Sequence, residues 1–507
     1  KHTDALEIYG DQLKEAGTVT EAELKEVRDM VSATLDSEFE SSKTWESTPN
    51  DWLASRWSGF LSPRQQSRIR ETGYDVDKLR DIGMKLSTLP ESFKPHKQMA
   101  KIFKAREKTI AEGKGIDWGT AEALAFGTLL IEGNHVRLTG QDVQRGTFSH
   151  RHACVTDQDT GELYTPLNNL AKHASPSAPL SVLKAPDVQA EFVARNSILS
   201  EFGVLGFEMG YSLENPNTLI LWEAQFGDFV NGAQVMIDQF ISAGEDKWLR
   251  QSGLVMLLPH GYMGQGAEHS SCRVERFLQQ VDEDPDAIPE MHEDERRQIQ
   301  MTNWQVVNCT TPANYYHVLR RQVHRDFRKP LIVVAPKNLL RDKKCTSTLE
   351  DMGQNTRFKR VINEENAEVT ANADKVRRVI YCTGKIYFEL DDFRTANGDT
   401  DVAIIRIEQL APFPWDKVRE EIERYPNAKH MWVQEEPKNM GAWSFVQPRF
   451  DTVLEDIAGD AWNRDQRVSF VGRAPAAATA TGLGARAHNA EQNEIMTKAF
   501  GTEEGAK

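Results

Sequence analysis

Short, continuous apolar runs constrain the fold of this chain more than any other feature of its sequence. Four such runs of strand length alternate with helical patterns, at residues 217–226, 253–260, 304–309 and 330–336, with helical periodicity at 232–244 and 312–323. Strands that are apolar on both faces and alternate with helices form a parallel sheet that is covered on both sides. The sequence therefore predicts an α/β domain, in which ligands bind beyond the carboxyl ends of the strands.

The helix and strand patterns before and after these runs predict that the chain has three parts. Thr20 and Glu23 form the pattern of a capping box, and a helical extension with a Trp- and Pro-rich strap is expected over residues 1–115. A larger α/β domain is expected over 116–328 and a smaller one over 329–507. The smaller one contains a polar connection and further strand and helix patterns, at 340–374, 376–384, 401–410, 414–426, 429–437 and 474–500. A chain of 507 residues is also too long for a single core.

Charge and composition exclude some classes of function. The formal net charge is −15, with 76 acidic against 61 basic residues, whereas nucleic acids and anionic membranes require a basic surface. No apolar run approaches the length of a membrane span, so we expect small molecules and other proteins as partners. Five scattered cysteines without metal-ligand spacing indicate a reducing compartment. The chain opens on Lys1 rather than methionine, as a processed or truncated piece would.

Glu201 is the first candidate functional residue, because it opens the apolar, glycine-rich stretch SILSEFGVLGFEMGY, residues 197–211. Ser200 is a favourable N-cap, and an acid in the first turn is stabilised by the helix dipole, so Glu201 could simply begin a helix. Alternatively, a carboxyl group desolvated among apolar neighbours has a raised pKa and can share a proton with a nitrogen heterocycle. Position alone leaves both interpretations open.

Two further candidate segments directly follow predicted strands. EAQFGDFVNG, residues 223–232, could present Phe226 and Phe229 to a flat ring, or both could belong to the core. PHGYMGQGAEHSS, residues 259–271, carries His260 and His269 in a glycine-rich loop. Such a loop suits close approach of the backbone to a ligand and acid–base chemistry by an imidazole.

A metal site is not predicted. His150 and His152 alternate along a possible strand, but no third ligand stands at a recognisable spacing, and a polar, arginine-bearing loop near an acidic substrate is the preferred interpretation of this segment. The sequence also lacks the GxSxG, Walker, HExxH and GxGxxG patterns, and GDG followed by paired asparagines.

Taken together, several long blocks resemble the thiamine-diphosphate-dependent 2-oxoglutarate dehydrogenase component family. They include LTGQDVQRGTFSHRHACV, LSEFGVLGFEMGY, LILWEAQFGDFVNGAQVMIDQFISAGEDKW, LVMLLPHGYMGQGAEHSS, RKPLIVVAPKNLLR and WVQEEPKNMGAW. The resemblance covers residues 45–500, and the insertion at 282–305 resembles the mitochondrial form, which implies the mitochondrial matrix. It implies a transketolase-like fold with a pyrimidine-binding domain, a C-terminal α/β domain and an N-terminal helical extension.

The resemblance also implies a reaction and roles for the candidate residues. 2-Oxoglutarate loses carbon dioxide on thiamine diphosphate, and the succinyl unit passes to a lipoyl group of dihydrolipoyl succinyltransferase, in a complex that also contains dihydrolipoyl dehydrogenase. Glu201 matches the family's glutamate that bonds the aminopyrimidine ring. Phe229 falls at the ring-stacking position, with Phe226 as the alternative. His269 matches the histidine near the reactive carbon and the 2-oxo acid, and His260 is the weaker candidate for substrate binding.

In this family a GDG…NN motif holds the diphosphate and magnesium in an upstream domain, and the cofactor lies between two subunits. The motif is absent from these 507 residues, so the sequence resembles the carboxyl-terminal half of a homodimeric component. We therefore expect the isolated chain neither to hold magnesium nor to turn over 2-oxoglutarate. Two alternatives stay open, namely a non-catalytic interaction module of the same complex and a relative that acts on 2-oxoadipate, whose side chain is one methylene longer.

Overall fold

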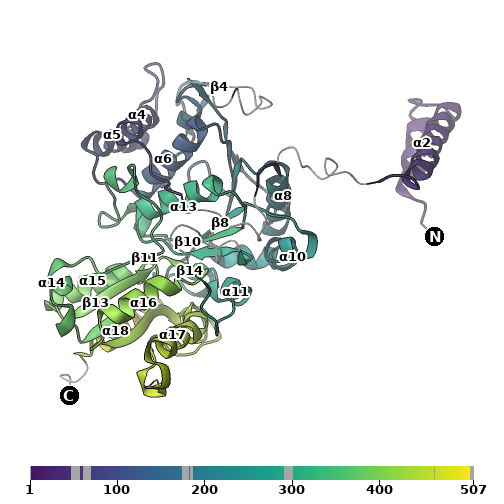
Figure 1. Cartoon of the computed structure of the whole chain (residues 1–507). Coiled ribbons are helices and arrows are strands. Elements are labelled where there is room, and N and C mark those ends of the chain that lie inside the picture. Colours follow the sequence, from purple (N-terminus) through teal and green to yellow (C-terminus); the bar gives the residue numbers. More distant parts are fainter. Residues whose placement is uncertain are drawn as a thin grey trace. The chain divides into compact units, whose positions relative to one another are not determined.

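The computed structural model describes residues 2–46, 57–60, 70–173, 182, 187–290, 301–461 and 463–502 (Figure 1). The chain divides into two compact units, Lys1–Ser58 and Gly59–Lys507. The first unit contains α1 (Ala5–Glu15) and α2 (Glu21–Ser42). The side chain of Thr20 accepts a hydrogen bond from the backbone N–H of Glu23, whose carboxylate accepts one in return from the N–H of Thr20, which confirms the predicted capping box.

A seven-stranded sheet forms the centre of the second unit. Its strands lie in the order β14 (Gln409–Ala411), β9 (Gln305–Val307), β10 (Leu331–Ala335), β8 (Val255–Pro259), β7 (Leu219–Glu223), β1 (Val136–Gly140) and β6 (Phe192–Asn196). Every neighbouring pair is parallel except β14 with β9. The four apolar runs are confirmed as the buried strands β7, β8, β9 and β10.

Helices cover both faces of this sheet. Successive residues of a strand point to opposite faces, so each strand contributes side chains to two cores. Leu219 and Leu221 of β7 belong to a core shared with α4 (Val76–Ser87), α5 (Lys97–Glu112), α6 (Trp118–Ile131) and α13 (Pro312–His324). Ile220 and Trp222 belong to a second core, which includes α8 (Glu201–Glu214) and α11 (Val274–Gln279). The helices α4 and α5, which lie within the expected extension 1–115, are therefore part of the first of these two cores.

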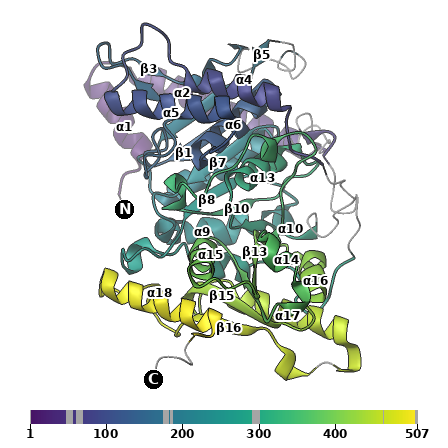
Figure 2. The same ribbon diagram turned by 90° about the vertical axis from the view of Figure 1, so that its left-hand side faces the viewer.

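The second sheet has five strands in the order β11 (Val361–Ile362), β13 (Val402–Ile407), β12 (Arg378–Cys382), β15 (Lys429–Pro437) and β16 (Ser469–Arg473). Only β11 is antiparallel to its neighbour. The helices of this part are α14 (Ala367–Thr370), α15 (Ile386–Asn397), α16 (Trp415–Arg424), α17 (Trp443–Ala458) and α18 (Ala485–Phe500). α18 lies beside β15 and β16, as Figure 2 shows. The strand β10 lies beyond residue 328 but belongs to the seven-stranded sheet.

The connections contain shorter elements. These are β2 (Val155–Thr156), β3 (Leu163–Tyr164), β4 (Lys172–His173), β5 (Val188–Gln189), α9 (Gln234–Met236) and α10 (Gly244–Trp248). The helical pattern expected at 232–244 is irregular, because a π-helical turn, Ile237–Ile241, follows α9.

Two buried histidines and one half-buried histidine make the folded chain sensitive to acid. Burial lowers the pKa of His152, His317 and His430 from 6.5 to about 4 in each case. Between these values the unfolded chain binds protons that the folded chain does not, so the free energy of unfolding should fall with falling pH. The expected slope is about 1.4 kcal/mol per pH unit for each histidine. Urea denaturation at about pH 7 and about pH 5 measures it.

A single substitution tests this origin of the acid sensitivity. His317→Gln should remove about one histidine's share of the pH slope, because His317 is almost completely buried. His2→Gln is the control, since His2 is exposed. An unchanged slope in His317→Gln would contradict the explanation.

Candidate functional site

The candidate site lies where loops from three adjacent parallel strands meet. The loop after β7 contains the 3₁₀ segment η3 (Gly227–Ala233), the loop after β8 contains η5 (Ala267–His269), and Lys337 follows β10. A Cβ atom on Gly227 would lie 2.4 Å from Cβ of Cys272, so the first two loops touch through their backbones. Glycine is required there because any side chain would separate the loops.

The structure brings Phe226, Phe229 and His269 together. The imidazole centroid of His269 lies 4.6 Å from that of Phe226 and 6.0 Å from that of Phe229, edge to face in both cases. The two phenylalanine centroids are 6.1 Å apart. Phe229 is 36% exposed and both partners are half-buried, so the group forms a partly open aromatic surface rather than an enclosed core.

Glu201 is the first residue of α8, and the Ser200 side chain accepts a hydrogen bond from the N–H of Gly203 as an N-cap. The expected helix start is thus confirmed. Glu201 is half-buried, and a Cβ atom on Gly232 of η3 would lie 3.5 Å from its Oε2. Within the described ranges its carboxylate has no hydrogen-bond or ion-pair partner, so this acid is available to a ligand beside the segment that carries Phe229.

His260 does not join this group. It is buried, its Nε2 donates to Oε1 of Glu436 at 2.8 Å, and its Nδ1 accepts a hydrogen bond from the N–H of Cys272 at 3.2 Å. Both ring nitrogens are therefore occupied. In the structure the ring connects the end of β8 to β15, and the substrate-binding role of His260 stays a prediction.

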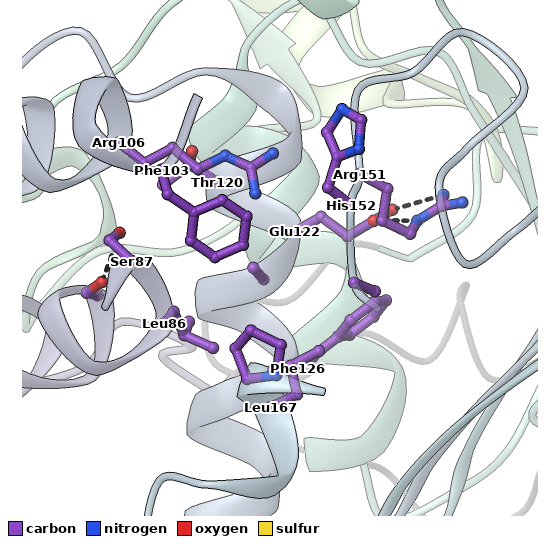
Figure 3. Close-up of a pocket in the computed structure, with 14 residues that line it drawn as sticks. Leu86, Ser87, Phe103, Arg106, Thr120, Glu122, Phe126, Arg151, His152 and Leu167 are labelled. Carbon is purple, nitrogen blue, oxygen red and sulfur yellow. Dashed lines mark hydrogen bonds and ion pairs between the residues drawn. The ribbon is translucent and has the colours of Figure 1, made fainter. Parts of the chain in front are cut away.

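His150 and His152 are also buried, and Figure 3 shows Arg151 and His152 among the residues that line a cavity. Arg151 lies between two buried carboxylates, at 2.5 Å from Glu122 and 2.6 Å from Glu223. The charge of Arg151 is thus used within the protein, whereas Arg145 of the same loop is exposed and Phe148 packs on Phe226 with ring centroids 5.4 Å apart, so the position of this loop near an acidic substrate stays a prediction. His152 lines a small cavity of about 30 Å³, and no three His, Cys, Asp or Glu side chains of the described part are placed to hold a metal ion.

Two residues of the site were not singled out from the sequence. Asp228 of η3 and Lys337 are both only 4% exposed and both bond to the loop that carries His269. The position of Lys337 immediately beyond a predicted strand is the signal that could have identified it. Asp228 lies between Phe226 and Phe229 in the sequence, but the sequence pattern does not show that its carboxylate bonds to the loop after β8.

Comparison with known proteins places this geometry in a family. Residues 114–343 match a family model described as the pyrimidine-binding domain of transketolase, and residues 346–500 match one described as the C-terminal part of 2-oxoglutarate dehydrogenase. The chain is 47% identical over 507 residues to the mitochondrial 2-oxoglutarate dehydrogenase of Dictyostelium discoideum, covering all of this chain and 48% of that protein. The chain belongs to the 2-oxoglutarate dehydrogenase family.

Other members of the 2-oxoglutarate dehydrogenase family match equally broadly. The mitochondrial 2-oxoglutarate dehydrogenase of Schizosaccharomyces pombe is 46% identical over 506 residues, with 99% of this chain and 48% of that protein covered. The 2-oxoglutarate dehydrogenase E1 component of Brucella anthropi is 44% identical over 509 residues, with 99% and 47% covered. The chain thus spans about half the length of the curated relatives it matches. In the described residues, no helix is both long and apolar enough to cross a membrane.

Proposed function

We propose that this chain supplies the pyrimidine-binding and carboxyl-terminal parts of a thiamine-diphosphate-dependent enzyme that decarboxylates 2-oxoglutarate and transfers the succinyl group to a lipoyl group. One observation carries the proposal. Glu201, whose carboxylate has no partner among the described residues, lies beside Gly232 of η3 at the carboxyl edge of a parallel sheet, and η3 also carries Phe229, whose ring contacts His269. This edge is where α/β sheets bind ligands.

The residues present fit an aminopyrimidine ring. Glu201 offers a ring nitrogen a carboxylate that has no partner among the described residues, and Gly232 adds no side chain beside it. Phe226 and Phe229 offer faces and edges on which a flat ring packs. We assign the cofactor contacts to Glu201, Phe229 and Phe226, and the substrate contact to His269. Magnesium ligands are expected outside this chain.

The chemistry divides between the cofactor and the protein. Thiamine diphosphate supplies the nucleophilic carbon and the electron sink for decarboxylation. Glu201 holds the proton exchanged with the pyrimidine nitrogen, and its half-buried position brings the carboxylate into a site from which a bound ring excludes water. His269, edge-on to both phenylalanines, orients and hydrogen-bonds the 2-oxo acid, and can move a proton at its ring nitrogens.

A homodimer is part of the proposal. The helix that begins at Glu201 exposes three aromatic side chains, with Phe202 44%, Phe207 55% and Tyr211 42% exposed. Aromatic residues are enriched in protein interfaces, and a partner subunit there would lie beside Glu201. We also propose that the pyrimidine-binding domain extends from 116 through β10 and that the C-terminal domain begins near 346. The sheet order and the extents of the two family models support this boundary.

The remaining assignments follow the relatives. We propose dihydrolipoyl succinyltransferase and dihydrolipoyl dehydrogenase as partners in a multienzyme complex of the tricarboxylic acid cycle. The mitochondrial matrix is the proposed location, supported by the names of the Dictyostelium discoideum and Schizosaccharomyces pombe relatives, although the Brucella anthropi relative is bacterial.

The test uses a protein in which this chain follows the amino-terminal half of the Dictyostelium discoideum relative, here called the joined protein. It should release carbon dioxide from carboxyl-labelled 2-oxoglutarate, dependent on thiamine diphosphate and magnesium, whereas the amino-terminal half alone should not. Preference over 2-oxoadipate should be about 10- to 200-fold in kcat/KM, as expected for one methylene. Absence of release while the Dictyostelium protein is active would favour the non-catalytic interaction module.

A further inference from the structure

The loop that carries His269 is bonded on its carboxyl side by one buried carboxylate. Oδ1 of Asp228 accepts hydrogen bonds from the backbone N–H groups of Ser270 at 3.0 Å and Ser271 at 3.1 Å. These are the two residues that follow His269. Hydrogen bonds to an ionised group are stronger than neutral ones, so this contact restricts the backbone more than an ordinary turn would.

The same loop is bonded at His269 itself by a buried ammonium group. Nζ of Lys337 donates to the backbone carbonyl oxygen of His269, and it lies 3.4 Å from Oε1 of Gln265. The same Nζ lies 5.9 Å from the ring centroid of Phe226. Lys337 therefore contacts both the loop and the aromatic surface that the His269 ring faces.

Burial of the Asp228 and Lys337 side chains has an energetic cost, and a loop with a purely structural role would not require it. Asp228 Oδ2 is buried without a hydrogen-bond partner among the described residues. Burial lowers the pKa of Lys337 to about 8, against the opposing effect of the Asp228 charge. Buried ionic groups of this kind are expensive unless they are paired or serve a function.

We propose that Asp228 and Lys337 are positioning residues that fix the backbone at His269 and at the two residues after it, and thereby hold the His269 imidazole against Phe226 and Phe229. They come from η3 and from the end of β10, the segments on either side of the β8 loop in the sheet order. The loop after β8 is thus fixed by segments that follow both of the neighbouring strands, β7 and β10. The fixed geometry stands on the contacts, and only its consequence for turnover rests on the proposed function.

A competing explanation is that hydrogen bonds within the loop are sufficient to fix its conformation. Oγ of Ser270 donates to the carbonyl of Gly266 at 2.5 Å, and the N–H of Gly261 donates to the carbonyl of Ser270 at 2.9 Å. If these internal bonds sufficed, removing the Asp228 carboxylate would leave the loop unchanged. The two explanations therefore differ in a measurable way.

Amide hydrogen exchange of the 507-residue chain tests the proposal without any need for activity. Asp228→Ala should accelerate exchange in residues 266–272 about tenfold or more, because the N–H groups of Ser270 and Ser271 lose their acceptor. Asp228→Asn keeps an Oδ1 acceptor and should remain within about threefold of the unchanged chain. Asp238→Ala is the control, since Asp238 accepts hydrogen bonds from Gln234 and Gln280 instead of this loop. Equal exchange in all four proteins would overturn the proposal.

Lys337 is tested in the same way. Lys337→Met should also accelerate exchange in 266–272, whereas Lys344→Met should not, because Lys344 is exposed and pairs with Asp392. Circular dichroism of each variant establishes that the fold is retained. Acceleration spread over the whole chain, rather than confined to the segment, would also overturn the proposal.

Turnover of the joined protein separates the positioning role from the proposed function. Asp228→Ala should lower kcat by about tenfold or more with a smaller change in KM, and Asp228→Asn should recover most of it. If exchange in 266–272 accelerates while kcat is unchanged, the positioning role stands and the assignment of His269 to the reaction fails. If exchange is unchanged, the positioning role itself fails, whatever the turnover.

Discussion

Glu201→Gln should lower the turnover of the joined protein by at least about 100-fold, with little change in stability. Glutamine preserves the size of the side chain but cannot hold the proton that the pyrimidine nitrogen exchanges, and acid–base groups contribute about 100- to 10,000-fold to rates. The Glu201 carboxylate has no partner in the described residues, so its replacement breaks no internal bond. Carbon dioxide release from carboxyl-labelled 2-oxoglutarate measures the effect.

Glu214→Gln is the matched control for this prediction, because Glu214 is exposed at the other end of α8. It should leave turnover within about threefold of the unchanged protein. Turnover of Glu201→Gln at the unchanged level would contradict the catalytic assignment and would favour the interaction module.

Arg151→Met should have the largest effect on stability, with a loss of about 3 to 5 kcal/mol in the free energy of unfolding. The substitution leaves the buried carboxylates of Glu122 and Glu223 without their cation, although Tyr315 still donates its hydroxyl to Glu122 at 2.7 Å. Urea denaturation of the 507-residue chain near neutral pH measures the loss.

Two further proteins make this prediction specific. Arg145→Met removes an exposed arginine that pairs with Asp142 and should cost less than about 1 kcal/mol. The triple variant Arg151→Met, Glu122→Gln, Glu223→Gln should recover part of the loss, because it removes the unpaired charges together. A loss below about 1 kcal/mol in Arg151→Met would show that these carboxylates do not depend on the arginine.

The sequence predicted the elements that are buried on both faces and missed those that depend on distant partners. The strands β7 to β10 are almost entirely buried and apolar except at Glu223 and Gln305, so their pattern is strong. The edge strand β6 ends in exposed polar residues and gave no such signal. Residues 401–410 were expected as one strand, but the chain divides at Glu408 into β13 and β14, which belong to different sheets. The buried Glu408 accepts hydrogen bonds from Thr310, about one hundred residues earlier, which no local pattern reveals.

The site shows the same division. Phe226, Phe229 and His269 could be grouped because each follows a recognisable strand, and parallel strands bring their carboxyl ends to one edge. In the structure His260 bonds to Glu436, 176 residues away, and Arg151 bonds to Glu223, 72 residues away. An isolated histidine or arginine in a polar loop gives no indication of such a partner, so both were expected to face a ligand.

Exchange of the proton at carbon 2 of the thiazolium ring of bound thiamine diphosphate tests the central claim most directly. In the joined protein, this exchange with deuterated solvent should be much faster than for the free cofactor, and Glu201→Gln should slow it by at least about 100-fold without loss of cofactor binding. Equal exchange rates in the two proteins, with the cofactor bound in both, would contradict the assignment of Glu201 as the proton partner of the pyrimidine ring.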